Sequence, residues 1–375
     1  MHVIGRDGDG PDTPEGCGQA YRAPLGRFRA GDGSAGARVA VDLDRPHAAL
    51  IVGKRGSGKT HTLAVVAEGV AATPGVAPVV IDPMGVLGGL AECGGSVHRR
   101  PRVRPDAVAA AAWPALLDLD PAGPVGSLVW RAVAERDGAT LAAARDAVAD
   151  ADAERATRRA ADAHLALAQR WDVFDPAGLT PADLTGGDVT VLDCSGLSPT
   201  ALDAVSAAVA RSLYEARVAE DVSRLPWLFV DEAHAVFDGV AGGALETLLT
   251  RGRAPGVSLV CATQRPAALP AVAVSQADLL LAHRLRGRAD VEALRDARPK
   301  PLADDLRSRL PTGVGEALVV DDATETATTV AVRERWTTDG GASARASRVD
   351  ATADGDGRET SEGVNPAGTQ SRPWT

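Results

Sequence analysis

The sequence predicts an α/β fold with a mostly parallel sheet, and three observations lead to this fold class. Short apolar runs typical of buried strands alternate with segments of helical periodicity over residues 46–97 and again over 188–335. A glycine-rich loop directly follows the apolar run 48–52. An acidic pair directly follows the apolar run 228–230.

The chain divides into four parts by composition. Residues 1–45 are rich in Gly, Asp and Arg and are expected to hold a short N-terminal β element. Residues 46–97 and 188–335 form the predicted α/β core. Residues 98–187, alanine-rich and interrupted by prolines, form a predicted helical insertion. Residues 336–375 have almost no apolar content, so burial cannot offset their ordering entropy and a disordered tail is expected.

The expected elements follow from the local patterns in chain order. The alternating segment 38–43 predicts one strand in the N-terminal part. Core strands are predicted at 47–52, 78–82, 188–193, 227–230, 257–262, 278–282, 316–320 and 328–333. Helices are predicted over 59–71 and 200–218. The longest helix is expected within the insertion, near 140–170.

The charge balance is typical of proteins kept soluble in concentrated salt. The formal charge is -10, and the only lysines are Lys54, Lys59 and Lys300, which resembles the proteins of salt-accumulating archaea. Because long-range attraction is screened within about 3 Å at molar salt, this charge does not exclude nucleic-acid binding. Without an apolar run of about twenty residues or a signal-peptide stretch, the protein is expected to be cytoplasmic. The dispersed cysteines predict neither a zinc site nor a disulfide framework.

Residues 53–60 spell a complete phosphate loop, G-x-x-x-x-G-K-T, directly behind the apolar run 48–52. Its glycines let backbone N–H groups wrap nucleotide phosphates at a helix start. Lys59 is expected to reach the β- and γ-phosphates, and the Thr60 hydroxyl to bind Mg²⁺. The alternative is a chance glycine-rich loop, which the order strand, loop, helix disfavours. The predicted ATP-binding residues are Gly53, Lys54, Arg55, Gly56, Ser57, Gly58, Lys59, Thr60 and His61.

The acidic pair Asp231-Glu232 ends the apolar strand 228–230. Asp231 is expected to hold the Mg²⁺ shell, and Glu232 to orient or deprotonate the attacking water. Acids at a strand end can also simply cap the next helix. The phosphate loop in the same chain favours the catalytic interpretation. A superfamily 2 helicase is excluded, because only about 140 residues follow this motif and a second motor domain does not fit.

The strand 257–262 leads into Thr263 and Gln264. A Gln or Thr at the tip of the strand beside the acidic strand can touch the γ-phosphate and the attacking water. Gln264 is therefore the candidate sensor. Taken alone, this residue would be weak support for a nucleotide-hydrolysing site.

Together with their flanking residues, these motifs resemble the HerA branch of the HerA/FtsK ATPases. The resemblance covers roughly residues 24–97 and 188–335. It is carried by Asp231-Glu232-Ala233-His234, Arg251-Gly252-Arg253-Ala254-Pro255-Gly256, Ala262-Thr263-Gln264-Arg265-Pro266, Ser275-Gln276-Ala277-Asp278, His283-Arg284-Leu285, Ile81-Asp82-Pro83-Met84-Gly85 and His47.

The resemblance implies a RecA-like P-loop NTPase that assembles as a hexameric ring and moves double-stranded DNA through its centre. It also implies a NurA-type nuclease as a partner in end resection. In a ring, an arginine of one subunit can neutralise charge in the neighbour's site. Arg251, Arg253 and Arg284 are the candidates, and the alternative for each is an ordinary surface contact.

Two other functions remain open at the level of the sequence. One is a non-translocating ATPase that regulates assembly of a partner nuclease or a defence complex. The other is a pump related to conjugation ATPases. Apolar anchors would favour the pump, and the sequence has none.

Overall fold

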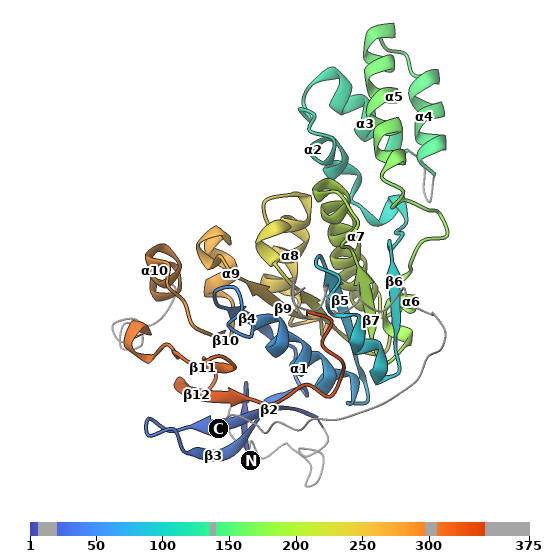
Figure 1. Ribbon diagram of the computed structural model, residues 1–375. Helices are drawn as coiled ribbons and strands as arrows, with labels where there is room; N and C mark the ends of the chain where they lie inside the picture. The colour runs from blue at the N-terminus through green and yellow to red at the C-terminus, as the bar shows by residue number, and fades with distance from the viewer. Residues whose placement is uncertain (7–20, 136–139, 297–305, 342–375) are drawn as a thin grey trace, which may run out of the picture. The chain divides into compact units, whose positions relative to one another are not determined.

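Twelve strands form one sheet in the computed structural model, which describes residues 1–6, 21–135, 140–296 and 306–341 (Figure 1). Residues 1–340 make a single compact unit. The strands are β1 His2–Ile4, β2 Arg22–Arg29, β3 Ala35–Asp42, β4 Ala48–Val52, β5 Val76–Asp82, β6 Ser96–Arg99, β7 Thr190–Asp193, β8 Leu225–Val230, β9 Ser258–Thr263, β10 Leu279–Ala282, β11 Glu316–Asp321 and β12 Thr326–Val332.

The α-helices of the described residues connect these strands. They are α1 Lys59–Ala71, α2 Trp113–Leu116, α3 Pro124–Ala134, α4 Leu141–Asp150, α5 Arg155–Arg170, α6 Pro181–Gly186, α7 Pro199–Val218, α8 Val240–Arg251, α9 Ala271–Ser275 and α10 Arg288–Asp296. Helices α1, α7 and α8 pack on the sheet, while α3, α4 and α5 pack on one another beyond α7 (Figure 1). Short 3-10 turns include η2 Gly88–Cys93, η5 Ala233–Ala235 and η6 Pro266–Ala268.

The sheet has a parallel and a largely antiparallel part. Strands β10, β4, β9, β8, β5, β7 and β6 lie side by side in that order and pair in parallel. Strands β11, β12, β2 and β3 continue it as antiparallel neighbours, and β1 pairs in parallel with β3 at the far edge. All seven residues of β5 are buried, as expected for a parallel strand covered on both faces. The predicted α/β class with a mostly parallel core is confirmed.

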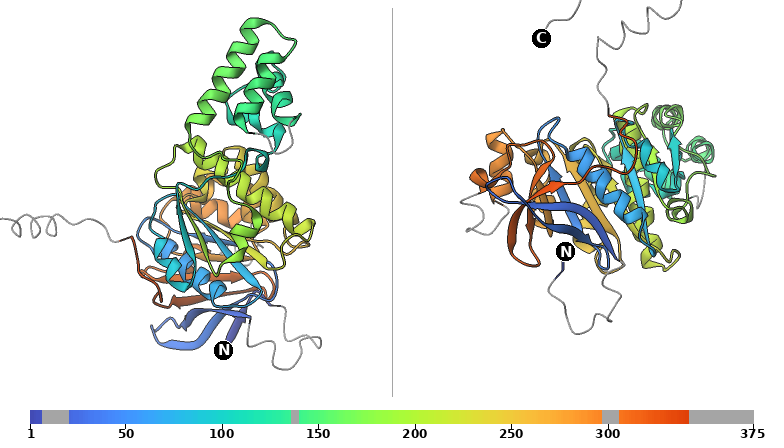
Figure 2. Two further views of the ribbon diagram at one scale, coloured as in Figure 1. Left: turned by 90° about the vertical axis from the view of Figure 1, so that its right-hand side faces the viewer. Right: turned by 60° about the horizontal axis from the view of Figure 1, so that its bottom comes forward.

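Alternate residues of each core strand face opposite layers. Leu50 and Val52 of β4 pack in one apolar cluster with α7, α8 and the helices of the 113–170 region. Ala49 and Ile51 of the same strand pack in a second cluster with α1 and strands β2 and β3. Figure 2 shows α1 beside the N-terminal strands, and α1 contacts β2 directly. The period of two along each strand therefore separates the two layers.

Residues 140–170 form two helices where the sequence predicted one long helix. The chain is extended at Ala151 and Glu154, and α5 folds back on α4. Arg158 donates to the carbonyl of Ala151 at 3.1 Å and so satisfies a carbonyl at the break. Folding back buries Val148 of α4 with Leu165 of α5 in one cluster, which a continuous helix would keep apart. The longest helix is instead α7, with 20 residues.

The N-terminal part contributes more than the single predicted strand. Strand β3 corresponds to the prediction at 38–43, but β1 and β2 were not predicted. Strand β2 lies directly against α1, where a Cβ on Gly69 would collide with Ala23. Ala23 and Leu25 are the fully buried residues of β2, and exposed or half-buried residues flank them. Two such residues give little periodic signal in the sequence.

Residues 333–340 follow β12 and cross α1, where the prediction expected a disordered tail to begin at Trp336. The buried carboxylate of Glu68 on α1 accepts hydrogen bonds from the backbone N–H groups of Trp336 and Thr337, both at 2.9 Å. Arg333 donates to the other oxygen of Glu68 at 2.7 Å and stacks 3.7 Å over the ring of Trp336. The remainder of the predicted tail, 342–375, lies outside the described residues.

Removing the Glu68 carboxylate should destabilise the fold. Burial alone would raise the pKa of Glu68, but hydrogen bonds from Thr337 and Trp336 and the Arg333 guanidinium lower it overall. The group is therefore ionised and fully paired. Glu68→Ala should lower the free energy of unfolding by about 3 kcal/mol, because it leaves a partly buried arginine and several hydrogen-bond donors without their partner. Chemical denaturation followed by tryptophan fluorescence measures this loss.

The matched control is Glu215→Ala. Glu215 pairs with Arg211 within α7, and its side chain is 54% exposed, so its loss should cost less than about 1 kcal/mol. Equal costs for the two variants would contradict the role assigned to Glu68.

Candidate functional site

The phosphate loop and the acidic pair meet at one edge of the sheet. Strand β4 runs into the loop 53–58, β8 runs into Asp231, and β9 ends at Thr263. These strands are parallel, and β9 lies between the other two. Their carboxyl ends therefore share one edge, as in other parallel sheets that bind ligands at this position.

The phosphate loop folds back on itself before α1 begins. The Ser57 hydroxyl donates to the carbonyl of Lys54 at 2.8 Å, and the Lys59 ammonium lies 3.5 Å from the same oxygen. Gly58, the N-cap of α1, has φ 112° and no side-chain cap, so the first N–H groups of α1 stay available to an anion. At Gly53 a Cβ would stand 2.5 Å from Ser57 Oγ, which explains the need for glycine.

Thr60 and Asp231 form the contact that joins the two motifs. The Thr60 hydroxyl donates to Asp231 Oδ2 at 2.9 Å. Burial raises the pKa of Asp231 to about 6, opposed by the hydrogen bond from Thr60. Burial also lowers the pKa of Lys59, against the attraction of Glu232 and Asp231. A hydroxyl and a carboxylate beside a buried lysine are oxygen ligands that suit Mg²⁺, and the pair fits a magnesium ion bound with a phosphate.

Glu232 is held from two sides at the end of β8. Its backbone is left-handed, with φ 47° and ψ 43°, a conformation uncommon outside glycine. Its N–H donates to Asp231 Oδ1 at 2.9 Å, and its Oε1 accepts a hydrogen bond from the side-chain amide of Gln264. Gln264, the candidate sensor, thus contacts the candidate base directly.

Two other predicted residues hold neighbouring segments against the loop. The backbone N–H of Lys54 donates to the carbonyl of Arg284 at 2.9 Å, and the Arg284 side chain donates to Thr312 O at 3.1 Å. The His61 ring lies 2.8 Å from the carbonyl of Arg333, at the start of the segment that crosses α1. Arg55, by contrast, is exposed at the loop tip.

The structure does not bring Arg251 and Arg253 to the phosphate loop of their own chain. Both are exposed at the end of α8, just before β9 begins. Arg253 lines a pocket of about 130 Å³ with His47 and Asp278, which precede β4 and β10. That is the amino-terminal edge of the parallel strands, opposite the edge that carries the loop.

Residues 98–104 are the densest positive stretch of the sequence, and the sequence alone fits either a DNA-facing loop or a solvated linker. The last arginines of this stretch are engaged with acids: Arg102 pairs with Asp172 at 2.8 Å, and Arg104 pairs with Asp106. The first part belongs to β6, an edge strand that the sequence analysis missed. Arg99 and Arg100 at the end of this strand are exposed.

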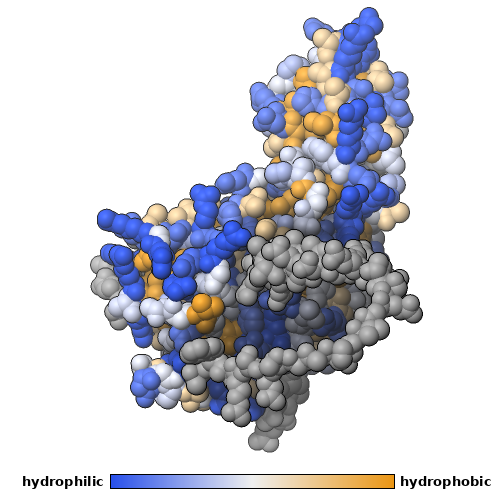
Figure 3. Space-filling view, in the orientation of Figure 1, coloured by the Kyte–Doolittle hydropathy of each residue, from blue (hydrophilic) through white to orange (hydrophobic). Residues whose placement is uncertain are grey.

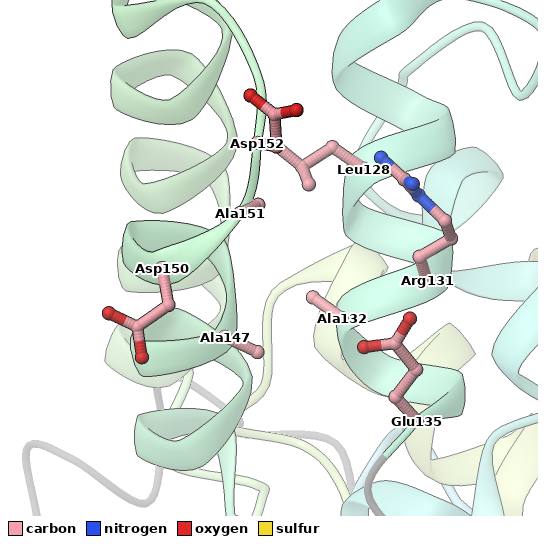
Figure 4. A pocket seen from close by; sticks show the side chains of 8 residues that line it. All are labelled: Leu128, Arg131, Ala132, Glu135, Ala147, Asp150, Ala151 and Asp152. Atoms are coloured by element: carbon pink, nitrogen blue, oxygen red, sulfur yellow. The ribbon is translucent and has the colours of Figure 1, made fainter.

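Other surface features do not coincide with the predicted site. Most of the described surface visible in Figure 3 is hydrophilic, with small separate hydrophobic patches. A pocket of about 300 Å³ lies between α3 and the end of α4, with Arg131 and Glu135 on one side and Asp152 on the other (Figure 4). None of the predicted site residues lines it. No helix within the described ranges has both the length and the hydropathy needed to span a bilayer.

Comparisons with known proteins identify the fold. No family model and no curated protein matches the chain. VirB4 of Thermoanaerobacter pseudethanolicus is similar in structure, with a TM-score of 0.62, 18% identity and coverage of 83% of this chain and 96% of that one. Plasmid coupling protein TrwB, solved with ADP and Mg²⁺, has a TM-score of 0.58 and 15% identity, covering 89% and 98%. The chain shares their fold. The predicted P-loop NTPase architecture is thereby confirmed.

Sequence analysis gave no role to several side chains beside the site. His283 is buried, contacts Thr62 of α1 at 2.9 Å and the Glu316 carbonyl at 2.8 Å, and burial lowers its pKa to about 4. Thr263 contacts His234 at 3.2 Å. Both histidines occur in the quoted motifs: His283 directly follows β10, and His234 lies in the turn η5 shortly after β8.

His47 lies at the opposite edge, between two carboxylates. Its Nδ1 is 2.8 Å from Asp278, and its Nε2 is 3.7 Å from Asp42, which also pairs with Arg6. Burial alone would lower the pKa of His47, but the hydrogen bond to Asp278 and the nearby charge of Asp42 outweigh it and raise the pKa to about 9. The imidazolium therefore links β3, β4 and β10 at neutral pH.

This arrangement predicts a pH dependence of stability. The folded pKa of about 9 exceeds the ordinary value near 6.5, so the contribution is complete below about pH 6.5 and is lost as pH rises through 9. The shift corresponds to about 3 kcal/mol. Denaturation across this range should show the loss in the wild type and not in His47→Gln.

The control for this measurement is His98→Gln, because His98 lies on the edge strand β6 and bonds only Ser96 in the described contacts. His98→Gln should show the same decrease of the free energy of unfolding with rising pH as the wild type. The same decrease in His47→Gln would contradict the proposed charge at His47.

Proposed function

We propose that the chain binds ATP with Mg²⁺ at the phosphate loop and hydrolyses it. The observation that carries this proposal is the 2.9 Å hydrogen bond from Thr60 to Asp231, with Lys59 and Glu232 as their direct neighbours in the chain. A lysine, a hydroxyl and two acids converge at the N-terminus of one helix. This combination suits phosphoryl transfer to water.

Each side chain has a distinct role in this mechanism. Thr60 and Asp231 would hold a magnesium ion, which neutralises charge on the phosphate oxygens. Lys59 contacts the β- and γ-phosphates, and the uncapped N–H groups at the start of α1 donate to phosphate oxygens. Glu232 orients the attacking water and accepts its proton, while Gln264 fixes the glutamate carboxylate.

We further propose that hydrolysis drives movement along double-stranded DNA in a HerA-like oligomer, in the cytoplasm of a salt-adapted cell. The motif resemblance to the HerA branch supports this. The fold shared with a conjugative coupling protein suits equally the pump related to conjugation ATPases that the sequence left open. The resemblance favours a hexamer and a NurA-type nuclease as partner. The location of Arg251 and Arg253, far from their own loop, is consistent with action on the site of a neighbouring subunit.

Glu232→Gln should abolish turnover and retain nucleotide binding. The amide preserves shape but cannot accept a proton, so kcat should fall by about 100-fold or more. Steady-state phosphate release with a fluorescent-nucleotide titration measures both quantities. Lys59→Ala should weaken binding instead, because it removes the charge that faces the phosphates.

Glu246→Gln on α8 serves as the matched acid-to-amide control and should behave as wild type. If Glu232→Gln hydrolysed ATP at the wild-type rate, Glu232 would not be the general base. That result would not contradict nucleotide binding at the phosphate loop.

Duplex DNA should stimulate hydrolysis in molar KCl. A translocating motor hydrolyses ATP for as long as it remains on the track, so its rate should rise with duplex length and then level off. Phosphate release with short and long duplexes, matched in total base pairs, tests this. An ATPase that only regulates docking of a partner predicts the same rate with and without DNA, and that result would overturn the translocase.

A further inference from the structure

The carboxylate of Glu232 is restrained unequally at its two oxygens. Gln264 donates to Oε1. Oε2 is buried and has no hydrogen-bond partner in the part of the chain that the structure describes. His234 Nδ1 lies 3.5 Å from Oε2, within ion-pair range but without a hydrogen bond. A buried carboxylate oxygen without a donor is costly, so its environment calls for a functional explanation.

His234 is itself held in place by the tip of β9. Its Nδ1 lies 3.2 Å from the hydroxyl of Thr263. That hydroxyl also accepts the backbone N–H of Arg265 at 3.1 Å, and Thr263 is fully buried. The ring therefore cannot move freely with respect to the sheet. Thr263 contacts His234, which lies beside one oxygen of the Glu232 carboxylate, and the adjacent Gln264 donates to the other oxygen.

We propose that His234 is a positioning residue for Glu232: with Thr263 holding its ring and Gln264 on the opposite oxygen, it fixes the plane of the carboxylate. The inference rests on the proposed hydrolysis. Oε1 is occupied by an amide donor, so Oε2 is the oxygen left free to accept the proton of the attacking water. The Oε2–H bond forms as an O–H bond of water breaks, and the hydroxide oxygen bonds to the γ-phosphorus as the bond from that phosphorus to the β,γ-bridging oxygen breaks and ADP leaves.

A purely structural role for His234 is less consistent with its surroundings. The side chain is 23% exposed, so it does not fill the core. Its ring reaches no partner beyond Thr263 and Glu232 in the described contacts. The left-handed backbone of Glu232 is the kind of strain that persists where neighbouring contacts enforce it.

The test compares ATP hydrolysis by the full chain and its variants. His234→Ala and Thr263→Val should each lower kcat by about tenfold, with KM for ATP within about twofold of wild type, because loss of orientation acts on the chemical step. His234→Asn keeps an N–H donor near the position of Nδ1, and Thr263→Ser keeps the hydroxyl. Both should recover most of kcat.

His98→Ala on β6 is the matched histidine control and should leave kcat and KM unchanged. Wild-type kcat in His234→Ala would overturn this inference alone, provided that the wild type hydrolyses ATP and Glu232→Gln does not. Two other results would also overturn it. One is a kcat of Thr263→Ser as low as that of Thr263→Val, and the other is a set of variants that change KM for ATP and leave kcat unchanged. A wild-type chain without hydrolysis would overturn the proposed function, and this inference with it.

Discussion

The parallel order of β4, β9 and β8 is the constraint on which the site depends. Asp231 follows a strand two positions from the strand that carries the phosphate loop, a separation of about 10 Å at ordinary strand spacing. Thr60 spans that distance from the first turn of α1 and reaches Asp231 at 2.9 Å. The tip of β9 then lies between the loop and the acids, and Gln264 at that tip donates to Glu232.

The same physics decides what the sequence could predict of the fold. The buried parallel strands are continuous apolar runs, such as Val79-Val80-Ile81 in β5, and are evident without tertiary information. β2 and β6 escape prediction because few of their residues are buried, so neither pattern is periodic. The break between α4 and α5 has no Pro or Gly to mark it. It exists because the folded-back pair buries Val148 with Leu165, a tertiary effect that local propensity does not carry.

For the site, the sequence identifies the residues but not their contacts. Lys59, Thr60, Asp231 and Glu232 follow from motif and position after a strand. The contact of Gln264 with Glu232 depends on the register of β8 against β9, in which Val230 lies opposite Cys261. A shift by one residue would turn Gln264 to the other face of the sheet. Register is a property of the assembled core, so side-chain pairing across strands became visible only in the structure.

Two pairs of acids in the described chain differ in the groups that surround their carboxylates. Glu68 and Asp42 have cationic partners and donors that hold their pKa low despite burial. Among the described residues, Asp231 accepts from the Thr60 hydroxyl and the Glu232 N–H, which do not offset the burial that raises its pKa to about 6. Oε2 of Glu232 and Oδ2 of Asp42 are both buried without a hydrogen-bond donor in the same part of the chain. A missing donor alone therefore does not mark an acid for chemistry. The place of Asp231 and Glu232 at a strand end beside Thr60 does, and it suits the proposed cation binding and proton transfer.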